Sequence, residues 1–173
     1  MAAGERRSPA QHTAHHIAQI DGLIQSQPNN PYFYELKGQA LLEGARPAEA
    51  IAPLRHAVTL AHNAPLIEIM LGQALIATDS AKNAEEAVPL LRAALAREPE
   101  QPEAYSQLAM AYGRKGDLAQ ADLAAAQAAL NRGDVKTARQ LASRAKTRLP
   151  VGSPAWVRAD DIVSVKTPAA PIR

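Results

Sequence analysis

Small and apolar residues recur along this chain with a period of about 34 residues. The first clear unit begins at Pro31, and its regularly spaced positions are held by Tyr34, Gly38, Leu41, Ala50, Leu54 and Ala57. Within each half of the unit, a spacing of three or four residues is that of one face of an α-helix. The pattern therefore predicts two amphipathic helices in each unit.

The same spacing returns in two further units. It is held from Pro65 by Leu71, Gly72, Leu75, Ala87, Leu91 and Ala94, and from Pro102 by Tyr105, Leu108, Ala109, Tyr112, Ala121 and Ala128. Because one helix pair cannot bury its apolar face alone, such pairs stack on their neighbours. The sequence predicts an all-α solenoid of helical hairpins, an open right-handed superhelix of about nine helices. We expect Gly38, Gly72 and Ala109 to lie buried between paired helices.

The two ends of the repeat array carry incomplete units. A lone helix is expected ahead of the first unit, and a second-helix signature recurs at Ala138, Ala142 and Ala145, so that residues 118–131 serve two units. Ser153, as an N-cap before Pro154, begins a final capping helix. We therefore expect a disordered segment at 1–12, a solenoid with a C-terminal capping helix at 13–164 and a disordered tail at 165–173.

Composition restricts the class of protein further. The chain of 173 residues is 47% hydrophobic but only 3% aromatic, and it has no cysteine, which excludes disulfides and a thiol nucleophile. Its net charge is only +2, but the positive charges are concentrated at the C-terminal end. No aromatic residues are interleaved with these charges, so we expect no nucleic-acid partner. No apolar run reaches the roughly 20 residues of a membrane helix, and no signal peptide is evident, so we expect no membrane insertion and the compartment stays open.

Motifs for catalysis or cofactor binding are not found in the sequence. His12, His15 and His16 have a spacing that occurs in metal sites, but Thr13 stands where a zinc peptidase motif HExxH needs its glutamate. The glycines of residues 113–117 lack the Lys-Ser/Thr pair of a nucleotide-binding loop. We expect a chain that is not an enzyme, with no catalytic residues, no metal site and no cofactor.

The repeated positions resemble the tetratricopeptide repeat (TPR), whose pattern has an aromatic residue, Leu-Gly, Tyr, Ala, a bulky residue, Ala and Pro at fixed places. The resemblance covers residues 31–150, with departures at Lys37, His62, Glu68 and Ala125. It implies a concave groove lined by the first helix of each unit, which would hold a protein or peptide ligand. The candidate groove residues are Tyr32, Glu35, Gln39, Leu66, Ile69, Gln73, Ile76, Met110 and Arg114.

The middle of this predicted groove is apolar, because Leu66, Ile69 and Ile76 are not required by the repeat pattern. Either these side chains contact a partner, or the curvature of the superhelix covers them. TPR co-chaperones that grip a C-terminal carboxylate carry Lys, Asn and Arg at set positions. This chain has Glu35, Gln39, Met70, Glu103 and Gln107 there and lacks that clamp.

Residues 17–163 also resemble the C-terminal TPR region of BepA-type bacterial zinc metallopeptidases, on stretches such as NNPYFYELKGQALLEGARPAEAIAPLRHAV and LAREPEQPEAYSQLAMAYGRKGD. The resemblance implies a periplasmic module that handles substrates or contacts a metallopeptidase catalytic domain. No catalytic residue carries over, so the chain would be a fragment, a truncated product or a stand-alone relative. A stand-alone scaffold or co-chaperone, or a subunit acting with a separate HExxH chain, remains the alternative.

Overall fold

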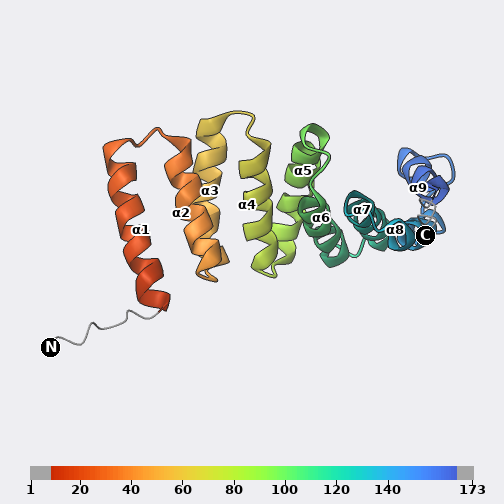
Figure 1. Cartoon of the computed structure of the whole chain (residues 1–173), viewed down its shortest axis with the longest axis horizontal. Helices are drawn as coiled ribbons and strands as arrows, with labels where there is room; N and C mark the ends of the chain where they lie inside the picture. Colours follow the sequence, from red (N-terminus) through yellow and green to blue (C-terminus); the bar gives the residue numbers. More distant parts are fainter. Residues whose placement is uncertain (1–8, 167–173) are drawn as a thin grey trace, which may run out of the picture.

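The computed structural model describes residues 9–166, and within this range the chain forms nine α-helices and no strand. The helices are α1 (Pro9–Ser26), α2 (Pro31–Glu43), α3 (Pro47–Ala61), α4 (Pro65–Ala77), α5 (Ala81–Arg97), α6 (Pro102–Arg114), α7 (Leu118–Asn131), α8 (Val135–Lys146) and α9 (Pro154–Ser164). They follow one another in an elongated row (Figure 1). The predicted all-α helical-hairpin solenoid is confirmed.

The predicted boundaries of the solenoid differ slightly from the observed ones. Helix α1 begins at Pro9, so residues 9–12, which were expected to be disordered, are helical. Helix α9 ends at Ser164, where the solenoid was expected to end. Residues 1–8 and 167–173, for which we also predict disorder, lie outside the described residues, so that prediction is not tested.

Local sequence signals set the ends of the helices. Proline occupies the first turn of α2, α3, α4, α6 and α9, where a missing N–H costs nothing. Side chains cap several N-termini: the Asn30 side chain accepts a hydrogen bond from the N–H of Tyr32, and Ser153 Oγ accepts one from the N–H of Trp156. Gly116 and Gly133 follow α6 and α7 with φ of 77° and 80°, a conformation that favours glycine.

Paired helices approach most closely where the sequence pattern places glycine. Gly38 and Gly72 are buried, and they face Leu54 and Leu91 from the second helix of their own hairpins, α2–α3 and α4–α5. Ala109, the equivalent residue in the hairpin α6–α7, is only half-buried. The predicted burial is therefore correct for the two glycines and only partly so for Ala109.

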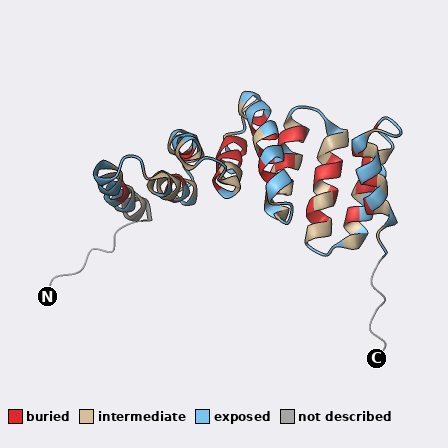
Figure 2. Ribbon diagram, turned by 90° about the horizontal axis from the view of Figure 1, so that it is seen from above, coloured by how far each residue is buried: buried red, intermediate tan, exposed pale blue. Residues whose placement is uncertain are grey.

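Buried side chains form two core clusters that meet at α7. The first extends from Leu41 to Ala124 through α2–α7, and the second extends from Leu123 to Ile162 through α7–α9. Figure 2 shows the buried positions on the sides of the helices that face their neighbours. Helix α7 packs against both α6 and α8, and α9 contacts both α7 and α8. This agrees with the prediction that residues 118–131 belong to two units.

First helices of successive hairpins also contact one another directly. Helix α4 lies against both α2 and α6, in addition to its own partner α5. Helices α3 and α5 each contain an internal proline, Pro53 and Pro89, and remain single helices. The resulting array presents α2, α4 and α6 side by side.

Candidate functional site

The predicted groove residues lie on α2, α4 and α6, and several of them are exposed. Tyr32 and Leu66 hold the second position of their helices with exposed fractions of 67% and 56%, and Met110 on α6 has 51%. Gln39 and Gln73, on α2 and α4, are also exposed. We call these residues the first-helix surface: Tyr32, Gln39, Leu66, Gln73 and Met110. It crosses three helices that pack side by side.

Of the two alternatives stated for Leu66, Ile69 and Ile76, cover by neighbouring helices holds for Ile76. Ile76 is only 2% exposed and belongs to the first core cluster, because α4 packs directly against α6 near this position. Ile69 is half-buried and packs on the same cluster. Of the three residues, only Leu66 presents most of its side chain to solvent.

Arg114, another predicted groove residue, joins two neighbouring units. Its guanidinium group donates a hydrogen bond to the carbonyl oxygen of Ile76 at the end of α4. It also pairs with Asp79, with 2.9 Å between Nη2 and Oδ1. Arg114 therefore fixes the end of α6 to the end of α4, and its charge is already compensated.

The two remaining polar candidates on α2 differ in their surroundings. Glu35 on α2 is half-buried. Gln39 donates a hydrogen bond to Glu43, with 2.9 Å between Nε2 and Oε1. Because that bond is local and exposed, a ligand could replace it at little cost.

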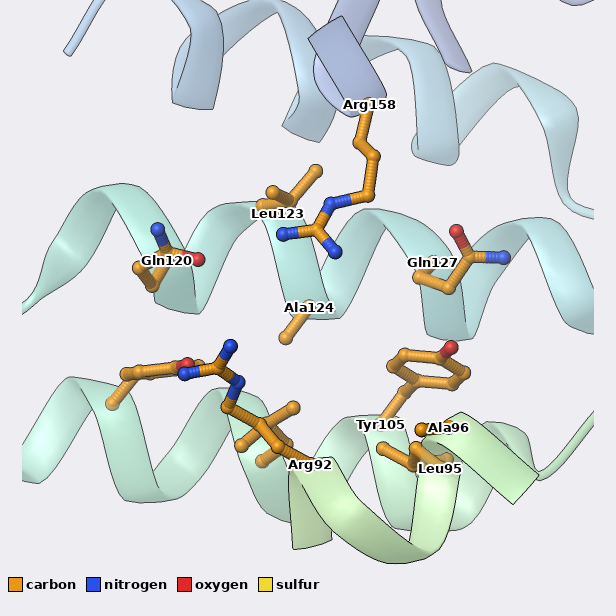
Figure 3. A pocket seen from close by; sticks show the side chains of 11 residues that line it. Arg92, Leu95, Ala96, Tyr105, Gln120, Leu123, Ala124, Gln127 and Arg158 are labelled. Atoms are coloured by element: carbon orange, nitrogen blue, oxygen red, sulfur yellow. The ribbon is translucent and has the colours of Figure 1, made fainter. Parts of the chain in front are cut away.

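A pocket of about 260 Å³ lies in a different part of the molecule, between α5, α6, α7 and α9. Leu95, Leu108, Leu123 and Ala124 provide its apolar lining. Its polar lining comes from Arg92, Tyr105, Tyr112, Gln120, Gln127 and Arg158. Figure 3 shows the Arg158 side chain extending from α9 over α7, with Gln120 and Gln127 on either side of Ala124.

The repeat pattern does not mark this pocket as a site. It places Tyr105 and Tyr112 in the packing between helices, and Tyr112 is indeed only 9% exposed. Arg92 and Arg158 belong to different units, so no local motif joins them. The one indication of the pocket in the sequence is the pair Gln120 and Gln127, two polar residues two turns apart on the alanine-rich helix α7.

Burial raises the pKa of both phenols in the pocket. The positive charge of Arg158 acts against the shift at both rings, and that of Arg92 acts against it at Tyr112, but neither cancels the effect of burial. Both phenols therefore stay protonated well above neutral pH and can donate hydrogen bonds.

The two pocket arginines, unlike most other arginines in the described part of the chain, form no ion pair with a carboxylate. Carboxylate partners are found for Arg46, Arg55, Arg97, Arg114, Arg132, Arg144 and Arg148. Within residues 13–166, Arg92, Arg139 and Arg158 form no ion pair. Two of these three uncompensated guanidinium groups line the same pocket.

Comparison with known proteins identifies the fold. No family model matches the sequence, and no curated protein matches it. A crystal structure of MamA is 20% identical over 91% of each chain, with a TM-score of 0.64. A second MamA structure is 21% identical over 88% of this chain and 78% of that one, with a TM-score of 0.67. MamA from Desulfovibrio magneticus RS-1, from residue 41 to its end, is 19% identical over 87% and 84%, with a TM-score of 0.66.

The fold is a TPR-like helical solenoid. At this sequence identity the likeness concerns the fold alone, and it carries no information on the metallopeptidase resemblance. Among the described residues of this TPR-like chain, no three His, Asp or Glu side chains lie close enough together to hold a metal ion. The helices in that part of the chain are too short or too polar to cross a membrane.

Proposed function

We propose that this chain is a non-catalytic protein-interaction module that binds a partner segment on its first-helix surface. The observation that carries the proposal is the exposure of Tyr32, Leu66 and Met110 on three helices that lie side by side. Large exposed apolar side chains on neighbouring helices favour an interaction site, and tyrosine and methionine are enriched at interfaces.

The proposed ligand is an extended or helical peptide segment with apolar side chains. Leu66 and Met110 offer it apolar contacts, while Gln39 and Gln73 offer both a donor and an acceptor for peptide groups. Ile76 and Arg114 are excluded from the contact surface, since one is buried and the other already holds α6 to α4. The apolar contact is thus centred on Tyr32, Leu66 and Met110.

The resemblance to the TPR region of BepA-type metallopeptidases supports a more specific form of this proposal. In that form the module binds substrates or a metallopeptidase catalytic domain in a periplasmic quality-control system. A stand-alone scaffold or co-chaperone, or a subunit that acts with a separate HExxH chain, is the alternative. Sedimentation of the purified chain with a BepA-type catalytic domain tests this form, and failure to form a complex would leave only the general module.

The general proposal is tested with peptides selected from a random displayed library against the full chain. Enriched peptides are then titrated against the wild type, Leu66→Ser and the matched control Leu118→Ser. Leu118 is the first residue of α7, is not one of the first-helix surface residues, and is 54% exposed, close to the 56% of Leu66.

Leu66→Ser is expected to weaken binding about tenfold or more, since a buried leucine contributes roughly 1.5–3 kcal/mol. Leu118→Ser is expected to bind as the wild type does. Equal binding by all three proteins, or an equal loss in both variants, would refute the proposed surface. Circular dichroism of each variant checks that the helices are retained.

A further inference from the structure

We propose that the pocket between α5, α6, α7 and α9 binds the carboxylate of a small acid or of an acidic peptide group. This site is separate from the first-helix surface. Its residues are also not those at the positions of the TPR carboxylate clamp, which this chain lacks. The proposal depends on two arginines and on a lining of both polar and apolar side chains, which the fold brings together from four helices.

Arg92 and Arg158 supply the positive charge. They project from α5 and α9, two helices that do not pack against each other, and both line the pocket (Figure 3). Neither pairs with a carboxylate among residues 13–166, although most arginines in that range do. Two like charges directed at one pocket repel each other, and an anion between them would remove this cost.

The rest of the lining indicates what kind of anion fits. Tyr105 and Tyr112 offer hydroxyl groups, and Gln120 and Gln127 offer amide groups, so the pocket has neutral donors beside its cations. Leucine and alanine side chains supply its apolar lining. An acid with an apolar body matches both parts, whereas the strongly hydrated oxygens of inorganic phosphate would meet leucine.

The size of the pocket limits the ligand. Its volume of about 260 Å³ is below the usual range of roughly 300–1,000 Å³ for sites that enclose a whole drug-sized molecule. A single side chain or a small organic acid fits such a space. The carboxylate could therefore come from a free acid or from a glutamate side chain of a peptide.

The test uses nuclear magnetic resonance titration of the full chain, following the side-chain amides of Gln120 and Gln127. The probes are 4-phenylbutyrate, its uncharged amide, a blocked peptide with one glutamate, and inorganic phosphate. A saturable shift with the acid, the peptide or both is expected, and the stronger of the two identifies the source of the carboxylate. The amide is expected to cause no saturable shift.

Arg158→Gln and Arg92→Gln are each expected to weaken binding of the carboxylate probe at least tenfold. Both side chains are exposed, so neither change removes a core contact. The matched control is Arg139→Gln on α8, which removes another uncompensated arginine outside this pocket and should leave binding unchanged.

Three outcomes would overturn the proposal: equal binding of acid and amide, tighter binding of phosphate than of either carboxylate, or equal losses in the pocket variants and the control. A peptide that requires Leu66 but not Arg158 would belong to the first-helix surface, so failure of one site is distinguishable from failure of the other.

Discussion

A Cβ atom built on Gly38 would lie only 2.4 Å from Cδ2 of Leu54, on the facing helix of the same hairpin. The next hairpin repeats this relationship, with 2.5 Å between a Cβ on Gly72 and Cδ2 of Leu91. Both leucines are fully buried, at 0% exposure, so neither can move aside into solvent. The repeated glycine therefore sets how closely the two helices of a hairpin approach.

Replacing Gly72 with valine is expected to lower the free energy of unfolding by about 1–3 kcal/mol, because the added side chain overpacks the contact with Leu91. Urea denaturation followed by circular dichroism measures the change. The control is Gly22→Ala, since a Cβ at Gly22 in α1 has nothing within 4 Å. There the better helix propensity of alanine should raise stability by up to about 1 kcal/mol. A valine variant as stable as the wild type would contradict the close approach.

The sequence was sufficient to predict contacts within one hairpin, since these repeat with the period of the chain. The burial of Gly38 and Gly72 between paired helices follows from the register of the units, whereas the leucines that face them, Leu54 and Leu91, are seen only in the structure. The shared role of α7 could also be predicted, because the second-helix signature recurs in α8 without a new first helix before it.

Contacts between units were less predictable. Ile76 is a candidate groove residue by the repeat pattern, but it lies in the core cluster to which both α4 and α6 contribute. The pocket depends on α9 returning to α7, which brings Arg158 close to residues of α5 and α6. Such relationships depend on how successive units are rotated, and no residue pattern within one unit encodes that rotation.

The capping helix α9 provides a second stability test. Ser153 Oγ accepts a hydrogen bond from the N–H of Trp156, with 3.2 Å between the two atoms. Ser153→Ala is expected to lower stability by about 1 kcal/mol, because a free N–H remains at the helix start. Trp156 is the single tryptophan of the chain, and Lys146 Nζ lies 4.4 Å from the centre of its ring, so its fluorescence reports on the contact between α8 and α9.

The matched control for this cap is Ser164→Ala, at the opposite end of α9, where the serine is exposed. The urea unfolding transition of Ser164→Ala, followed by Trp156 fluorescence, should coincide with that of the wild type. If Ser153→Ala also unfolds at the wild-type urea concentration, the cap does not stabilise α9.

Pro89 is an exposed proline inside α5, and replacing it with alanine is expected to stabilise the protein. Alanine restores a backbone donor for the carbonyl of Glu85 and removes a steric clash, which together are worth about 3 kcal/mol in a helix interior. The greater freedom of the unfolded chain offsets roughly 0.4–1 kcal/mol of this gain. The midpoint of urea denaturation should therefore rise. A lower midpoint would mean that the proline shapes α5 for packing against α4 and α6.

Alkaline stability provides a test of the raised phenol pKa values in the pocket. Burial raises the pKa of Tyr112 in the folded chain, so the unfolded chain loses this proton first as the pH rises. The corresponding stability is complete below the unfolded pKa of about 10 and is lost as the pH rises through the folded value.

Tyr112→Phe removes this pH dependence, because phenylalanine has no proton to lose. Its stability relative to the wild type should therefore improve between about pH 8 and about pH 10.5, as measured by urea denaturation at both values. Tyr105→Phe should behave in the same direction, since burial also raises the pKa of Tyr105. Other groups that titrate in this range are common to all three proteins and cancel in the comparison. If the wild type and both variants lose stability in parallel, the phenols are not shielded from water, and the pocket is more open than its lining indicates.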